Sequence, residues 1–281
     1  MTLDPATRDS LLAALSWQIE LGVDECVGET PANRFEEVAK VARPPQSTPA
    51  SAFSSAPPTP APRPAGAPDG GEAVTEARRL AAGAGSLPAL HDAMKAFDGC
   101  ALKQGARNTV FADGNPAARV MFIGEAPGRD EDREGRPFIG RSGQLLDRML
   151  AAIGLDRRSG DPSTAAYITN VLPWRPVGDR DPSTDEGLML WAFLERHIAL
   201  VEPEIIVTLG KISAATMTGR AIRITRERGR WEAPVRAGGR PMLMTFHPAY
   251  LLRQPQEKAK SWRDLLSLRA ALDGAAPEIQ G

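Results

Sequence analysis

The sequence contains few residues of the kinds that build disulfide scaffolds. Only two cysteines, Cys26 and Cys100, occur among its 281 residues, and histidine occurs three times. Two thiols are too few for a fold stapled by disulfides, and they suit the reducing environment of the cytoplasm. We therefore expect a cytoplasmic protein whose fold depends on a hydrophobic core.

Long apolar runs and a large net charge are also missing. No run approaches the ~20 apolar residues that span a bilayer, and the N-terminus lacks the basic start and apolar centre of a secretory signal. The formal net charge is -1, so the chain as a whole does not attract nucleic acid. We expect no membrane partner, and any DNA binding must come from local basic patches.

The composition divides the chain into three parts. Residues 1–42 predict a small helical segment, because an apolar stripe of roughly helical period runs from Ser10 to Val27. This segment is either a plain appendage or a helix that docks a partner protein. Residues 43–72 are rich in Pro, Ala and Ser and predict a disordered linker, because they cannot bury a core. Residues 73–281 form the expected folded domain.

Short apolar segments alternate with amphipathic ones through the folded domain. We expect strands at residues 120–123, 167–172, 205–209 and 242–245. We expect helices at residues 73–82, 87–97, 144–153, 185–201 and 259–272, and a further helix after Gly210. Buried strands that alternate with helices are typical of an α/β fold, here a three-layer α/β/α sandwich around a mainly parallel sheet.

Unusual side chains follow the predicted strands. Glu125, Asn170 and His247 stand at or just beyond three strand ends, and the charged loop after Glu125 also carries Glu131 and one large ring, Phe138. In an open α/β sheet, ligands bind outside the carboxyl ends of the strands. A pocket there could stack a flat ring, read its hydrogen-bonding edge with an amide, and handle protons with a carboxylate or an imidazole.

Each of these residues also has an ordinary structural interpretation. Phe138 alone could be a core ring, Asn170 a turn cap, and Glu131 one member of a solvated charge run. A histidine followed by proline at a strand end, as at His247, favours a functional role. Their joint arrangement at one edge of the sheet is what indicates a site.

Three motifs in a fixed order make the prediction more specific. They are G-E-A-P-G-R-D-E-D-R-E-G-R-P-F-I-G-R-S-G-Q-L-L from Gly124, I-T-N from Ile168, and H-P-A-Y-L-L-R from His247. With them, residues 97–272 resemble the uracil-DNA glycosylase superfamily, most of all its thermophile-type family 4 branch. The resemblance implies a hydrolase of base excision repair that flips deoxyuridine out of uracil-containing DNA and hydrolyses its N-glycosidic bond, leaving an abasic site.

The resemblance also implies a role for each matching residue. Phe138 would stack on uracil, and Asn170 would hydrogen-bond its N3–H and O4. His247 would stabilise the charge that develops at O2, and Glu131 would orient water or stabilise the oxocarbenium-like sugar. The turn after the first strand would lie against the base, through Glu125, Ala126 and Gly128.

Two further groups of residues are expected to contact DNA. The resemblance implies that Leu251, Leu252 and Arg253 form a wedge that enters the duplex, although the two leucines could be ordinary packing residues. Arg228 and Arg230 belong to an arginine-rich stretch between residues 220 and 240. That stretch is either a solvated loop or a phosphate-binding patch.

One feature departs from the family pattern. Family 4 proteins hold a [4Fe-4S] cluster with four cysteines, and the aligned positions here are Phe97, Cys100, Trp174 and Leu190. Cys26 lies across the predicted linker, and two thiols cannot supply four ligands. We therefore expect no metal and no cofactor, with an apolar plug in the place of the cluster.

Three functions compete at this point. The first is an active uracil-DNA glycosylase, expected as a monomer that associates with the nucleoid while it acts on DNA. The second is a catalytically weak or inactive relative that binds damaged DNA. The third is a nucleotide-binding α/β module, because Gly-rich turns also cradle phosphates, although no G-x-x-x-x-G-K-[ST] loop is present.

Overall fold

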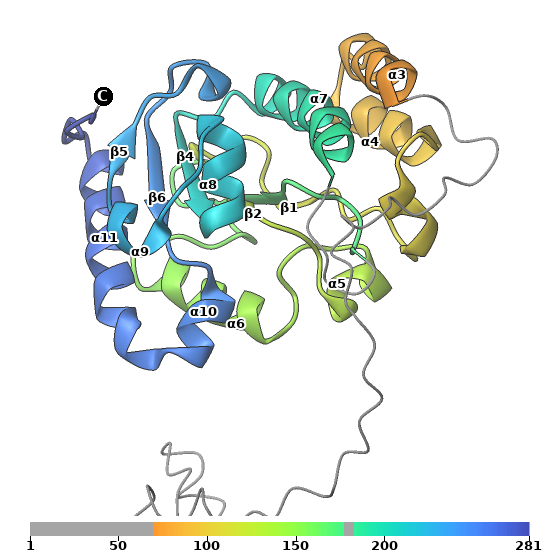
Figure 1. Ribbon diagram of the computed structural model, residues 1–281. Helices are drawn as coiled ribbons and strands as arrows, with labels where there is room; N and C mark the ends of the chain where they lie inside the picture. The colour runs from red at the N-terminus through yellow and green to blue at the C-terminus, as the bar shows by residue number, and fades with distance from the viewer. Residues whose placement is uncertain (1–69, 177–182, 281) are drawn as a thin grey trace, which may run out of the picture. The chain divides into compact units, whose positions relative to one another are not determined.

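The computed structural model of the protein describes residues 70–176 and 183–280 (Figure 1). The chain divides into two units, residues 1–61 and 62–281. The predicted N-terminal helices and most of the predicted linker lie outside the described residues. Helix α3 (Gly70–Gly83) begins before the expected domain boundary at residue 73, so the predicted linker extends too far toward the C-terminus.

A six-stranded sheet forms the centre of the folded domain, in the order β1-β3-β2-β4-β6-β5. Its strands are β1 (Ala112–Gly114), β2 (Val120–Gly124), β3 (Tyr167–Asn170), β4 (Ile205–Leu209), β5 (Trp231–Glu232) and β6 (Met242–Thr245). The four inner strands are parallel, and the edge strands β1 and β5 are antiparallel to their neighbours. The predicted mainly parallel sheet is therefore confirmed.

Helices cover both faces of this sheet (Figure 1). They are α4 (Leu87–Ala96), α5 (Arg129–Glu134), α6 (Arg141–Ala151), α7 (Thr184–Val201), α8 (Lys211–Thr218), α9 (Ile224–Glu227), α10 (Pro248–Arg253) and α11 (Lys258–Leu272). Short 3-10 turns are η1 (Ala101–Gly105), η3 (Val235–Ala237) and η4 (Pro255–Glu257). Within the described residues, the helices predicted from periodicity form, with ends that differ by a few residues.

Alternation along each inner strand explains the three layers. In β2, Met121 and Ile123 belong to the core under α3, α4, α7 and α8. Val120 and Phe122 belong to a second core, which packs against α6 and α11. Successive side chains of a strand point to opposite faces, so an entirely apolar strand must be covered on both sides. The β2 run V-M-F-I is buried throughout for this reason.

Local signals fix the helix starts that matter for the site. Helix α7 begins with a capping box, in which the Ser183 hydroxyl accepts from Glu186 N at 3.2 Å and the Glu186 carboxylate accepts from Ser183 N at 2.8 Å. Helix α10 has Pro248 at its first position, where the missing N–H costs nothing, and His247 as its N-cap.

No helix among the described residues is long and apolar enough to cross a membrane.

Candidate active site

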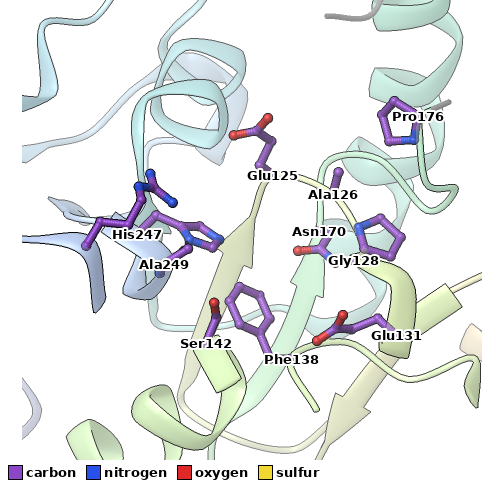
Figure 2. A pocket seen from close by; sticks show the side chains of 12 residues that line it. Glu125, Ala126, Gly128, Glu131, Phe138, Ser142, Asn170, Pro176, His247 and Ala249 are labelled. Atoms are coloured by element: carbon purple, nitrogen blue, oxygen red, sulfur yellow. Dashed lines mark hydrogen bonds between the residues drawn. The ribbon is translucent and has the colours of Figure 1, made fainter. Parts of the chain in front are cut away.

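A cavity of about 440 Å³ opens beyond the carboxyl ends of β2, β3 and β6 (Figure 2). It contains eight residues that the sequence assigned to a site: Glu125, Ala126, Gly128, Glu131, Phe138, Asn170, His247 and Arg253. The cavity thus lies where ligands bind in open α/β sheets. Its construction can be followed one strand end at a time.

The end of β2 makes room for two side chains from elsewhere. A Cβ added at Gly124 would collide with Asn170 Oδ1 and with the ring of Phe138. Glycine is therefore required at this position for the amide and the ring to approach each other. The carbonyl oxygen of Glu125 accepts from Leu172 N at 2.9 Å, while its side chain is exposed at the mouth of the cavity (Figure 2). The backbone of Glu125 thus joins the β2 turn to the segment after β3.

Phe138 is held in an unusual conformation. Its φ is 54°, in the left-handed region, and its side chain is only 5% exposed. A Cβ at Gly143 in α6 would collide with the Phe138 carbonyl, so this glycine lets the loop cross the helix. Strained conformations of non-glycine residues cluster at functional sites, where the surrounding structure fixes them. The ring lies 5.5 Å from the His247 ring, centroid to centroid.

Glu131 fixes the loop that carries Phe138. Its Oε1 accepts from the backbone N–H groups of Ile139 at 3.0 Å and Gly140 at 2.9 Å. Its Oε2 lies against Gly128, where an added Cβ would be 2.6 Å away. Figure 2 shows the carboxylate extending from α5 toward the loop of Phe138. Glu131 therefore stabilises the loop of Phe138, and one of its carboxylate oxygens is used for hydrogen bonds to the backbone.

Asn170 presents a buried acceptor without a partner. It is the last residue of β3 and is 6% exposed, and no hydrogen bond from a described residue reaches its Oδ1. More than about nine in ten buried polar groups are hydrogen-bonded, so an orphaned one needs an explanation. Figure 2 shows the oxygen directed into the cavity. A bound molecule with a hydrogen-bond donor would satisfy it.

Burial sets the protonation state of His247, and the local backbone sets its tautomer. Burial, and to a lesser extent Arg253, lower its pKa to about 4, and Glu131 opposes the shift. The imidazole is therefore neutral at pH 7. Its Nδ1 accepts from Ala249 N at 3.1 Å, which leaves the proton on Nε2. The site thus contains a neutral N–H donor beside the ring of Phe138.

The structure corrects one part of the predicted DNA wedge. Leu251 is 1% exposed and packs with Leu145 and Phe246 in a small core. A side chain in that position cannot enter a duplex without leaving its packing. Leu252 is half-buried and Arg253 is exposed, so only these two of the three predicted wedge residues have accessible side chains.

Arg228 has a different role from the predicted phosphate contact. Its Nε donates to Asp264 Oδ2 at 2.8 Å, and its Nη2 donates to the Lys260 carbonyl at 2.8 Å and also pairs with Asp264 Oδ1. Asp264 is buried and accepts from Thr245 Oγ1, at the end of β6, at 2.6 Å. The guanidinium of Arg228 is therefore the counter-charge of a buried carboxylate. Arg230 is exposed and free of this role.

Comparison with known proteins agrees with this geometry. The family model of the Uracil DNA glycosylase superfamily matches residues 111–266. A type-4 uracil-DNA glycosylase of Thermotoga maritima is 37% identical over 164 residues, which cover 57% of this chain and 80% of that protein. The Pyrobaculum aerophilum protein of the same name is 35% identical over 184 residues, covering 64% and 91%. The chain belongs to this superfamily and to its type-4 branch.

The four positions that the family resemblance predicts for cluster cysteines do not fit an iron–sulfur cluster. Phe97, Cys100, Trp174 and Leu190 are all buried in one hydrophobic core. The Phe97 ring packs on Phe193 at 5.5 Å between centroids, and Trp174 Nε1 donates to Thr109 Oγ1 at 3.0 Å. Three of the four positions offer no thiolate, and cluster iron is held by thiolates or, in some centres, imidazoles. The side chains at these positions therefore cannot supply the ligands of an iron–sulfur cluster.

Sequence reasoning missed some residues of this type-4 site. Ser142, Pro176 and Ala249 also line the cavity. Ser142 lies in the G-R-S-G segment at the start of α6, which belongs to the first motif, and that membership was the available signal. Pro176 and Ala249 contribute small apolar surfaces, for which the sequence gives no chemical signal. Helix α10 was missed as well, although the proline after His247 marks its start.

Proposed function

We propose that this protein removes uracil from DNA by hydrolysing the N-glycosidic bond of a deoxyuridine that is flipped into the cavity. The observation that carries the proposal is the unpaired, buried Oδ1 of Asn170, directed into a cavity that also contains Phe138 and a neutral His247. A base inside a duplex is out of reach of such a site, so the nucleotide must leave the stack. Membership in the type-4 branch supports the same reaction.

The amide of Asn170 suits the edge of uracil. Its oxygen accepts from uracil N3–H, and its NH2 group donates to O4. Cytosine presents an acceptor at N3 and a donor at N4, the reverse pattern. Cytosine would leave both groups of a buried amide unpaired, and sites of this kind reject the wrong ligand strongly. Phe138 supplies the stacking face for the base.

His247 and Glu131 suit the chemical step. As the bond from C1′ to N1 breaks, the electron pair remains on uracil and negative charge develops at O2. The Nε2–H of neutral His247 donates to that oxygen, and this bond strengthens as the charge grows. Water adds to C1′ and loses a proton to solvent, while Glu131 Oε2 stabilises the positive charge of the oxocarbenium-like sugar.

The remaining predicted contacts complete the proposal. Leu252 and Arg253, at the end of α10, support the extruded nucleotide, and Arg230 contacts a phosphate. We infer that the protein acts as a monomer. We also infer action in the cytoplasm, at the nucleoid while the enzyme is on DNA, and a partner-docking role for residues 1–42.

We further propose that the domain works without an iron–sulfur cluster. The apolar residues buried at three of the four aligned positions support this inference, because packing then holds together segments that a cluster would otherwise join. Iron analysis of the purified, untagged protein tests it, and we expect no stoichiometric iron and no visible absorbance of a cluster. A brown protein with four iron atoms per chain would contradict the inference.

The activity is tested with an oligonucleotide that contains one labelled uracil. We expect release of free uracil, and no release when cytosine or thymine occupies the same position. Asn170→Ala and His247→Ala should each slow release by roughly a hundredfold or more, whereas the matched control Asn115→Ala, remote from the cavity, should not. Binding of uracil-containing DNA without release would instead favour an inactive damage-binding relative.

A further inference from the structure

No hydrogen bond from the described residues fixes the side-chain oxygen of Asn170. The position of the amide therefore depends on the backbone at the end of β3. On one side β3 pairs with β2, with Asn170 opposite Gly124. On the other side its pairing with β1 ends one residue earlier, where Thr169 faces Ala112. The sheet alone therefore supports Asn170 from one side only.

A short segment, Thr109 to Phe111, supplies the missing support. The Thr169 hydroxyl donates to the Phe111 carbonyl at 2.7 Å, just before Asn170. Val110 N donates to the Pro173 carbonyl at 2.8 Å, and Trp174 Nε1 donates to Thr109 Oγ1 at 3.0 Å, both just after Asn170. Three hydrogen bonds thus bracket Asn170 from both directions along the chain. We use the name clamp segment for residues 109–111.

The clamp segment is in turn fixed by a column of three rings. Phe111 stacks between His91 of α4 and His197 of α7, with centroid distances of 4.8 Å and 4.3 Å. His197 Nε2 shares a hydrogen bond of 2.8 Å with the hydroxyl of Tyr167, the first residue of β3. Burial lowers the pKa of His197 to about 3, so that ring stays neutral in the column. Phe111 is the central member that both imidazoles contact.

The space behind Asn170 explains why the ring matters. A void of about 10 Å³, lined by Phe111, His197 and Asn170 among others, separates the column from the back of the site. A void of this size is near the minimum of about 10–15 Å³ that one water needs, so it leaves Asn170 little room to retreat. Removal of the Phe111 ring would enlarge it and loosen the clamp segment.

We propose that Phe111 is a positioning residue for base recognition: held between His91 and His197, it fixes the clamp segment that sets the position of Asn170. The inference rests on the proposed function. It concerns a residue outside the cavity, which contacts neither base nor sugar. Displacement of a reacting or recognising group by about 1 Å can cost up to a hundredfold in rate, so a loose clamp should be visible in kinetics.

The test compares Phe111→Leu with Phe193→Leu by single-turnover uracil release and by affinity for uracil-containing DNA. Phe193 is a fully buried ring of the same layer without hydrogen bonds to the clamp segment, so its truncation controls for lost packing. We expect Phe111→Leu to slow release by roughly tenfold or more with DNA affinity nearly unchanged. Phe111→Tyr, which keeps the ring, should restore the rate, and Phe193→Leu should leave it near that of the wild type.

A second background separates positioning from a general loss of structure. If Phe111 acts through Asn170, Phe111→Leu should cause no further loss in protein that already carries Asn170→Ala. Thr109→Val, which removes one clamp hydrogen bond at almost constant shape, should slow release by roughly threefold. Equal losses from Phe111→Leu in both backgrounds, or an unchanged rate in the wild-type background, would overturn the inference. Absence of uracil release by the wild type would overturn the proposed function itself, and this inference with it.

Discussion

At the scale of single residues, Glu131 has two oxygens with different surroundings. Oε1 accepts from two backbone N–H groups of the loop that carries Phe138, and Oε2 lies against Gly128 at the cavity wall. Bracing the loop requires only an acceptor, whereas stabilising a sugar cation requires the negative charge. The two requirements can therefore be separated by substitution.

Glu131→Gln keeps the acceptor and removes the charge, and Glu131→Ala removes both. We expect the glutamine variant to melt near the wild-type temperature but to release uracil roughly ten to a hundred times more slowly. The alanine variant should be slower still and less stable by about 1–3 kcal/mol, because two part-buried N–H groups lose their partner. Thermal melts and single-turnover rates measure both effects. A glutamine variant with the full rate would restrict Glu131 to the bracing role.

His247 makes a second prediction at this scale, for the dependence of rate on pH. Its folded pKa of about 4 lies below the ordinary value of 6.5, so the imidazole stays neutral through the whole range between them. Protonation adds a hydrogen at Nδ1, which then can no longer accept from Ala249 N. We expect protonation of His247 to leave the rate of uracil release unchanged until the pH approaches about 4. An acidic limb centred near 6.5, absent from a His247→Gln variant, would contradict the structure.

At the scale of elements, sequence periodicity predicted the longer helices and strands and missed the shortest ones. The four parallel strands are short, mainly apolar segments, and both of their faces must be covered, so their burial and order along the chain follow from the sequence. The edge strands β1 and β5 are three and two residues long, and α5 and α10 are six residues each. Elements of this length carry no measurable period, and tertiary contacts determine them.

The same limit explains which of the predicted residues the structure brings into one cavity. Asn170, Phe138 and His247 lie at strand ends or in marked loops, so the topology alone brought them together. The fates of Leu251 and Arg228 depended on packing between elements, which a sequence pattern does not reveal. A buried leucine next to a half-buried one, and an arginine two positions from an exposed one, cannot be told apart in the sequence until the core is assembled.

The junction between β6 and α11 provides a matched pair for a prediction at this scale. Arg228→Ala would leave the buried carboxylate of Asp264 without its counter-charge, and breaking such a pair costs about 3–5 kcal/mol. Arg230→Ala removes an exposed cation two residues away. We expect the first variant to unfold at clearly lower denaturant concentration. The second should fold normally and reduce the slope of DNA affinity against salt by about one. A stable Arg228→Ala variant with a reduced salt slope would instead show that Arg228 contacts DNA.

At the scale of the whole molecule, charge is divided unevenly along the chain. Residues 1–61 contain four basic and eight acidic residues, so the remainder has 30 basic and 27 acidic residues and a net charge of +3 against -1 for the full chain. The unit from residue 62 onward contains every described site residue and the whole matched family region, residues 111–266. By its net charge, the segment of residues 1–61 therefore opposes the attraction of the remainder to phosphates.

Deletion of residues 1–61 should therefore change the affinity for DNA without changing the rate of uracil release. We expect the shortened protein to fold and to release uracil in single turnover at a rate within about twofold of the full chain, because it retains each contact to the base. Its affinity for DNA at low salt should rise, because four net negative charges are lost, and the difference should shrink as salt shortens the Debye length to about 10 Å near 0.1 M. The control is a chain in which the acidic residues of this segment are neutralised without deletion, and it should reproduce the change in affinity. A shortened protein that binds DNA more weakly at every salt concentration would instead assign residues 1–61 a direct contact with DNA, and would show that net charge is the wrong guide to this segment.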